Sequence, residues 1–179
     1  MRYPLVYGGL AGVIAIAAIV ATLLLDLPDH LHSEWFGYLV MLVALSMIFV
    51  GVKRYRDVEC GGVIRFGRAL ALGLGIAVVA GLIYVAGWEL YIGFAGWDFV
   101  ANYLADYTAG IVETMRAEGA TATAIQAKQA EMRELAELYR NPLYRMPITF
   151  AEIFPVGLLV ALVSAALLRN PRLLPARRA

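Results

Sequence analysis

The chain has 179 residues, of which 61% are hydrophobic and only 16% charged, with a net charge of +1 and a mean hydropathy of +0.72. This composition excludes an ordinary soluble domain and indicates an integral membrane protein, built as a single membrane domain over residues 1–179. The one cysteine, Cys60, excludes an internal disulfide, and the alternation of basic and acidic residues excludes a nucleic-acid surface.

Membrane spans are the first elements that the sequence predicts. A helix needs about 20 apolar residues to cross about 30 Å of hydrocarbon. Stretches of this kind cover residues 4–25, 35–52, 69–94 and 148–168. The first follows Arg2 as a signal peptide would, but its apolar run is too long and no small-x-small cleavage site follows, so it is read as a retained span. The expected fold is all-α, a four-transmembrane-helix bundle.

Small residues recur at four-residue steps within these spans. Examples are Gly8 with Gly12, Ala77 with Gly81, and Gly157 with Ala161. Small side chains let helix backbones approach closely in lipid. The steps therefore predict tight packing, either inside one bundle or between copies in a homo-oligomer.

The basic residues predict the orientation of the spans. They gather at Arg2, in the loop of residues 53–68 and in the tail of residues 169–178, which lie on one side if there are four spans. Because loops rich in Lys and Arg stay inside, both termini are expected to be cytoplasmic.

The loop between the third and fourth spans is long, and two helices are expected in it, forming an external, periplasmic-side helical hairpin of about residues 98–140. Apolar side chains recur every four residues along the first helix, at Phe99, Tyr103, Tyr107, Ile111 and Met115. Thr123 and Gln126 form a candidate capping box for the second helix. The two helices could bury these stripes on each other, cap the bundle or dock a protein partner.

Carboxylates at the outer ends of the spans are the candidate site. Glu34, Glu89 and Glu152 are expected at similar depth on three different spans. Pro155 frees the carbonyl of Ala151 beside Glu152 and would supply another oxygen. Charges in spans usually face protein or water, so a site for a proton, a cation or a small polar ligand is one interpretation. The other is that each carboxylate bonds to Tyr, Trp or backbone groups as a structural element.

Two histidines lie in the first outer loop. Asp29, His30, His32 and Glu34 are residue types that bind zinc or a similar divalent cation. The pattern is weak, because an H-x-H pair places both rings on one side only in an extended loop. A divalent cation is therefore a candidate ligand only. No sequence motif of a hydrolase, a P-loop or a dinucleotide site is present.

Several segments of the sequence resemble those of a known bacterial family. "MLVALSMIFVGVKRYRD", "GGVIRFGRALALGLGIAVVAGLIYVAGWELY" and "NPLYRMPITFAEIFPVGLLVALVSAALLR" look like the membrane-protein family catalogued as domain of unknown function 4199. The resemblance implies a multi-pass protein of the bacterial inner (plasma) membrane and no particular activity. Its recurring phrases match at five places: Glu34 with Tyr38, Tyr55-Arg56-Asp57, Gly61-Gly62 with Phe66, Trp88-Glu89, and Glu152-Ile153-Phe154-Pro155. His30 and His32 are not part of this pattern. Arg56-Asp57 and the two glycines then look like a turn that holds the second and third spans together.

Three functions follow from these observations. The first is binding or conduction of a proton, cation or small polar ligand at a site of Glu34, Glu89, Glu152 and Pro155, with Tyr38 and Trp88 beside it. The second is a non-catalytic assembly or accessory subunit that uses the external hairpin to dock a partner. An intramembrane metal-dependent hydrolase is the third, and its incomplete ligand set makes an enzyme the weaker expectation.

Overall fold

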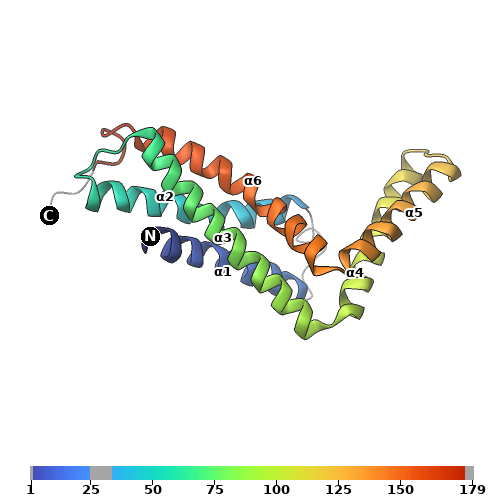
Figure 1. Cartoon of the computed structure of the whole chain (residues 1–179). Helices are drawn as coiled ribbons and strands as arrows, with labels where there is room; N and C mark the ends of the chain where they lie inside the picture. Colours follow the sequence, from blue (N-terminus) through green and yellow to red (C-terminus); the bar gives the residue numbers. More distant parts are fainter. Residues whose placement is uncertain (1, 25–33, 176–179) are drawn as a thin grey trace. The chain divides into compact units, whose positions relative to one another are not determined.

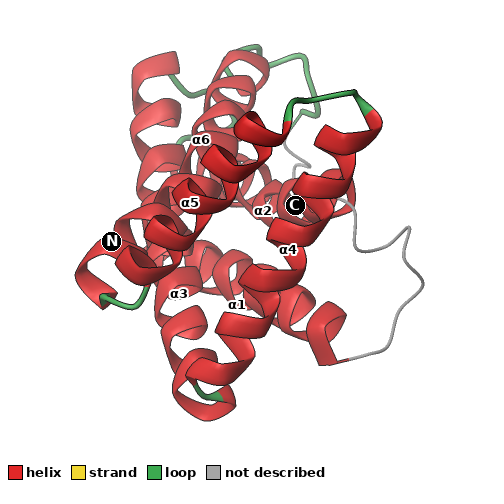
Figure 2. Ribbon diagram, turned by 90° about the vertical axis from the view of Figure 1, so that its right-hand side faces the viewer, coloured by secondary structure: helices red, strands yellow, loops and turns green. Residues whose placement is uncertain are grey.

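The computed structural model describes residues 2–24 and 34–175, and in these ranges all regular secondary structure is helical (Figures 1 and 2). The helices are α1 (Arg2–Leu24), α2 (Glu34–Glu59), α3 (Phe66–Ala95), α4 (Trp97–Ala117), α5 (Ala122–Tyr139) and α6 (Pro142–Leu168). Four of them, α1, α2 from Gly37, α3 and α6, are long and apolar enough to cross a membrane. The sequence-based prediction of an all-helical chain with four apolar spans is confirmed.

Two helices extend beyond their predicted spans by six or more residues. α2 continues past residue 52 to Glu59, and its charged last turns are supported by an ion pair between Lys53 and Asp57 at 2.5 Å, one turn apart. α6 begins six residues before the expected start, at Pro142. Proline suits the first helical position because its missing N–H would have no partner there, and the Asn141 side chain accepts from the Leu143 N–H at 3.0 Å.

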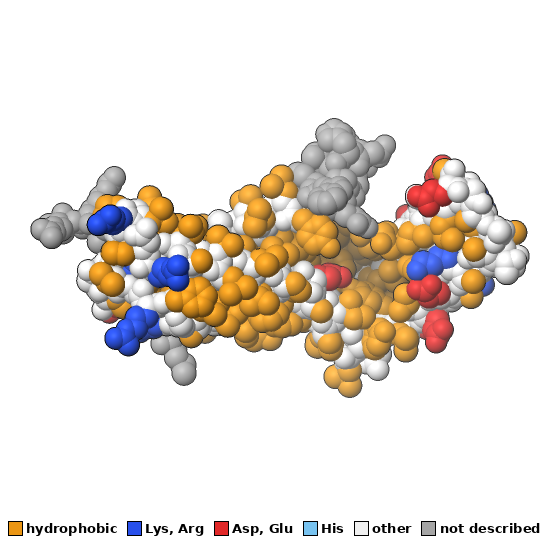
Figure 3. All heavy atoms as spheres, turned by 90° about the horizontal axis from the view of Figure 1, so that it is seen from above, with side chains coloured by type: hydrophobic (Ala, Val, Ile, Leu, Met, Phe, Trp, Pro, Cys, Tyr) orange, Lys and Arg blue, Asp and Glu red, His pale blue; other side chains and the backbone are white. Residues whose placement is uncertain are grey.

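The chain divides into two compact units, one of residues 1–87 with 149–179 and one of residues 88–148. The first unit contains α1, α2, most of α3 and most of α6. Its core is apolar and includes Leu45, Ile48, Ile76 and Ile153, all with an exposed fraction of 1% or less. Much of its outer surface is also hydrophobic, and Lys and Arg gather at the end where α2 meets α3 (Figure 3).

Glycines make the contact between α1 and α3 in this unit very close. A methyl group added at Gly12 would lie 2.6 Å from the carbonyl oxygen of Ala80, and one at Gly8 would lie 2.7 Å from that of Ile76. A side chain at either position would therefore overlap the α3 backbone. The small-residue step at Gly8 and Gly12 therefore packs two helices of the same chain against each other.

Small residues also line the contact between α3 and α6. A methyl group added at Gly73 would lie 3.0 Å from the Ala161 Cβ, and one at Gly157 would lie 3.0 Å from the Ala77 Cβ. The steps at Ala77 and at Gly157 with Ala161 thus serve helix packing within this unit.

The second unit contains α4 and α5, which lie side by side, with the adjoining ends of α3 and α6. Gly119, with φ of 79°, lies between them. The cap of α5 is Thr121, whose side chain accepts from the Ala124 N–H at 3.2 Å, so the capping box expected at Thr123 was wrong by two residues. Thr121 has the extended backbone that an N-cap requires.

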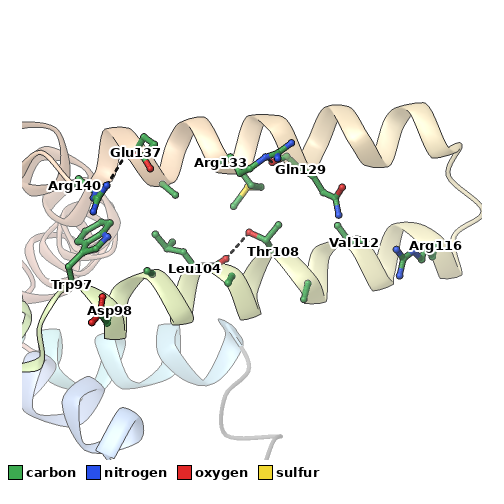
Figure 4. A pocket seen from close by; sticks show the side chains of 15 residues that line it. Trp97, Asp98, Leu104, Thr108, Val112, Arg116, Gln129, Arg133, Glu137 and Arg140 are labelled. Carbon is green, nitrogen blue, oxygen red and sulfur yellow. Dashed lines mark hydrogen bonds and ion pairs between the residues drawn. The ribbon is translucent and has the colours of Figure 1, made fainter.

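The face of α4 turned toward α5 also differs from the expected stripe. It carries Ala101, Leu104, Thr108 and Val112, whereas Tyr103 and Tyr107 are nearly half exposed (Figure 4). Tyrosines can keep their hydroxyls in a polar environment, which fits the exposure of Tyr103 and Tyr107. The tyrosines do recur every four residues, but they do not form the face of α4 that is turned toward α5.

Candidate functional site

Glu89 is paired with an arginine that the sequence analysis did not assign to the site. Arg145 Nε donates to Glu89 Oε1 at 2.7 Å, and Arg145 Nη2 donates to Glu89 Oε2 at 2.5 Å. The pair is bidentate, the strongest common geometry for these groups, and only 4% of Arg145 is exposed. Within the second unit it joins the end of α3 to the start of α6.

Tyr139, the last residue of α5, connects the same pair to a third helix. Its backbone carbonyl accepts from Arg145 Nη1 at 3.0 Å, and the Arg145 guanidinium lies 5.7 Å from its ring centroid. Its hydroxyl accepts from the Trp88 indole Nε1–H at 3.0 Å. We call Trp88, Glu89, Tyr139 and Arg145 the Arg145 cluster.

The Arg145 cluster compensates the negative charge of Glu89. Each carboxylate oxygen accepts a charge-assisted hydrogen bond from a buried guanidinium, so the negative charge of Glu89 is compensated within the chain. A cation at Glu89 would have to compete with Arg145. Glu89 therefore has the properties of a structural ion-pair partner.

Glu152 lies on α6 in the first unit and has a different environment. Within the described ranges it forms no hydrogen bond and no ion pair, and its side chain is exposed on the surface of the helix. Leu159 and Val163, which follow at seven and eleven residues, share this helix face and are 62% and 55% exposed. The carboxylate thus interrupts an otherwise apolar, outward-facing strip of a candidate span.

Pro155 lies one turn after Glu152, and α6 continues through it. Because proline has no N–H, the carbonyl of Ala151 receives no helical hydrogen bond from that position. Glu152 and the Ala151 carbonyl are neighbours in the chain and together offer oxygen ligands. That these oxygens form one site stays a prediction.

The other predicted site residues are distributed as follows. Glu34 is the first residue of α2, and its side chain lies outside the described part of the structure, as do Asp29, His30 and His32. Tyr38, one turn further along α2, is exposed. Among the described residues, no group of three or more His, Cys, Asp or Glu side chains could hold a metal ion. Glu89 and Glu152 belong to different units, so their common site stays a prediction.

A second buried arginine lies in the last turn of α2, in the first unit. Arg56 is fully buried; its Nε donates to Asp57 Oδ1 at 2.7 Å. Its Nη1 and Nη2 donate to the carbonyls of Leu173 and Leu174 at 3.0 and 2.5 Å. The expected turn at this place exists, since Gly61 and Gly62 have φ of 61° and 89°. However, Arg56 binds the segment that follows α6.

An open groove of about 840 Å³ lies between α4 and α5 (Figure 4). Its α4 side carries Ala101, Ala105 and Ala109, whose small side chains leave the space open. At one end the Arg140 guanidinium lies 5.1 Å from the Trp97 ring centroid. The groove therefore has an apolar floor with charged and aromatic groups at its ends.

Arg145 could have been found from the sequence by one signal. It is a basic residue near the start of an apolar span, on the side where the acidic residue Glu89 was also expected. An arginine and a glutamate at equal depth on neighbouring spans are candidates for pairing, because an unpaired charge is costly there. The Leu173 and Leu174 carbonyls have no such signal, since every residue carries one.

Comparison with known proteins identifies the family. The sequence model of the family described as "Protein of unknown function (DUF4199)" matches residues 6–170, nearly the whole chain. The chain belongs to this family. The resemblance found in its sequence is therefore confirmed, and the four apolar helices of this DUF4199 member fit a membrane protein. No functionally curated protein and no solved structure matches it.

Proposed function

We propose that this DUF4199 member is a non-catalytic membrane protein, a single membrane domain of the bacterial inner membrane with cytoplasmic termini, that binds a proton or a cation at Glu152. The observation that carries the proposal is that Glu152 lies in an apolar span without a hydrogen bond or ion pair in the described part of the chain. Ionisable groups in spans are costly and usually mark ion or proton sites.

The energetic costs of the charged and protonated forms of Glu152 favour exchange of a proton or a cation there. A charged side chain at the centre of a span costs about 2.5 to 3.5 kcal/mol on insertion scales. Protonating an ordinary glutamate, with a pKa of about 4.3, costs about 3.7 kcal/mol at pH 7. Glu152 lies near the outer end of its predicted span, where a charge costs less than at the centre, so the charged form is accessible at neutral pH and the protonated form at lower pH. A bound cation would lower the cost of the charged form, with the Ala151 carbonyl as a second ligand.

Compared with the three-carboxylate site expected from the sequence, the proposal gives Glu89 a supporting role. Arg145 compensates the charge of Glu89, which leaves Glu152 as the acid that can exchange. Glu34, Tyr38, Trp88 and Pro155 remain candidates for the surroundings of the ligand, and a divalent cation is one candidate ligand.

Carbodiimide labelling tests the proposal, because a carbodiimide reacts with a protonated carboxyl group in an apolar environment. We expect Glu152 to be modified in the purified protein in liposomes, with labelling that falls when pH or cation concentration rises. Glu152→Gln should remove the label and any proton- or cation-dependent flux, whereas the exposed control Glu118→Gln should change neither. A folded protein that is not labelled at Glu152 between pH 5 and pH 8 would refute the proposal.

A second candidate function is assembly through α4 and α5, with a second copy of the chain as the partner. The observation in its favour is that Tyr103, Tyr107, Leu135 and Leu138 are each at least 38% exposed on the surface of these helices. α5 carries both signs of charge, and α4 is acidic apart from Arg116 in its last turn, so basic residues of α5 in one copy can pair with acidic residues of α4 in a second copy.

Co-purification of two differently tagged copies tests this assembly. The full-length pair should co-purify, and replacing residues 98–140 with a short flexible linker in both copies should abolish the association. Association that survives this replacement would assign the contact to another surface.

A further inference from the structure

A cavity of about 740 Å³ lies where α2 ends and α3 begins, in the first unit. Arg65 and Arg68 line it together with Glu59 and Val63. It is separate from Glu152, from the Arg145 cluster and from the groove between α4 and α5, and none of the functions above uses it.

The two arginines of this cavity have no acidic partner among the residues that the structure describes. Within the described ranges neither Arg65 nor Arg68 forms an ion pair, and both side chains are exposed. The Arg68 guanidinium lies 5.4 Å from the Tyr55 ring centroid, which leaves its N–H donors available at the ring edge. Glu59, the acidic residue of the lining, accepts from the Tyr3 hydroxyl at 3.0 Å. Two arginines and one glutamate give the lining a net charge of +1.

Apolar side chains are exposed beside these cations. Val58, Val63 and Phe66 are 64%, 59% and 38% exposed. They lie at the ends of two candidate spans, Gly37–Glu59 and Phe66–Ala95, where a bilayer changes from hydrocarbon to headgroups. Exposed cations next to exposed apolar groups at this level fit a molecule that is itself anionic at one end and apolar at the other.

We propose that this cavity binds the phosphate group of an anionic phospholipid. Arg65 and Arg68 donate to the phosphate oxygens, for which the planar guanidinium is well shaped. The acyl chains lie along Val58, Val63 and Phe66. A free phosphate ion would use the same arginines, but it would leave these apolar side chains uncovered.

The test compares lipid binding to full-length variants in detergent, with phosphatidylglycerol as the probe and phosphatidylcholine as the zwitterionic reference. Each basic residue near the membrane surface contributes about 1 kcal/mol to binding of an anionic lipid, and about 1.4 kcal/mol corresponds to tenfold in affinity. The double variant Arg65→Gln with Arg68→Gln should therefore bind phosphatidylglycerol about 30-fold more weakly. The control is Arg54→Gln with Arg169→Gln, which removes two exposed arginines that do not line the cavity. The control should bind within about twofold of the unchanged protein.

A second variant keeps the test valid if the double substitution prevents folding. Gly67 lines the cavity, and a methyl group added there would meet nothing within 4 Å. Gly67→Glu therefore adds a negative charge without disturbing packing and should also weaken phosphatidylglycerol binding. Equal loss in the Arg54 and Arg169 control, or unchanged binding in both cavity variants, would overturn the proposal. So would inorganic phosphate at 10 mM that displaces the lipid completely, since the site would then be one for the free ion. These readouts are independent of Glu152.

Discussion

The two buried arginines of the described part of the chain use the same chemistry in opposite ways. Arg145 donates to the carboxylate of Glu89, 56 residues away in the sequence, and to the backbone carbonyl of Tyr139, six residues away. Arg56 takes its carboxylate from the adjacent Asp57 and its carbonyls from Leu173 and Leu174, more than a hundred residues away. In the first case the ion pair makes the tertiary contact, and in the second the backbone carbonyls do. The same change of charge should therefore have different effects at the two places.

The largest effect is expected for Glu89→Ala, because it leaves the Arg145 guanidinium buried without a counter-charge. Removing one partner of a buried pair costs about 3 to 5 kcal/mol in the free energy of unfolding. We expect that loss in a mild detergent, together with faster trypsin cleavage after Arg140. The exposed control Glu134→Ala should stay close to the unchanged protein, and an equal loss there would show that the effect does not depend on Arg145.

Arg56→Met should cost less, about 2 to 3 kcal/mol, because the Leu173 and Leu174 carbonyls lose their donors but lie where water can reach them. Asp57 keeps its ion pair with Lys53. The local signature should be trypsin cleavage after Arg172, with the region of α4 and α5 unaffected. The control is Arg54→Met, at an exposed position; increased cleavage after Arg140 in Arg56→Met would mean that the two regions are not independent.

A double substitution sharpens the difference between the two arginines. Glu89→Leu with Arg145→Met removes both charges and fills a similar volume, and only the Tyr139 carbonyl loses its donor, so the free energy of unfolding should lie about 1 to 2 kcal/mol below the unchanged value. Asp57→Leu with Arg56→Met should recover nothing relative to Arg56→Met alone, because the carbonyls still lack donors. If both double variants recover equally, the proposed division between ion pair and carbonyl contacts is wrong.

The smallest effect is expected for Trp88→Phe, which removes the hydrogen bond to the Tyr139 hydroxyl and keeps most of the aromatic contact. The loss should be about 1 kcal/mol, and Tyr139→Phe should give a similar one. The combined variant should lose little more than either alone, because both remove the same bond. Fully additive losses would show that the hydrogen bond does not contribute.

Apolar runs and their lengths predicted the four spans well, because hydropathy and helix length depend on local sequence. The small-residue steps also pack helices closely in the first unit, as the sequence predicted. Equal depth makes Arg145 and Glu89 candidates for pairing, but the spacing in sequence does not establish the pair, since two residues 56 apart carry no periodic signal. The sequence left open whether the tyrosine stripe of α4 faces α5, and in the structure Ala101, Ala105 and Ala109 line the α4 side of the groove between the two helices. Nor does it assign donors to backbone carbonyls, which is why the contacts of Arg56 were missed.

The glycine and alanine contacts of α3 also limit how this sequence can change. On one face α3 meets the backbone of α1 at Gly8 and Gly12, and on an adjacent face it meets α6 at Gly73 and Ala77. α3 presents Val79 and Ile83 to the α1 glycines, so larger side chains are excluded at Gly8 and Gly12 of α1 and at Gly73 of α3. Val78 and Leu82 of α3 are exposed and are free to vary among apolar residues. Substitutions accepted during evolution of this helix should therefore concentrate on one narrow strip. A deep mutational scan would trace that strip as the part of α3 that faces lipid.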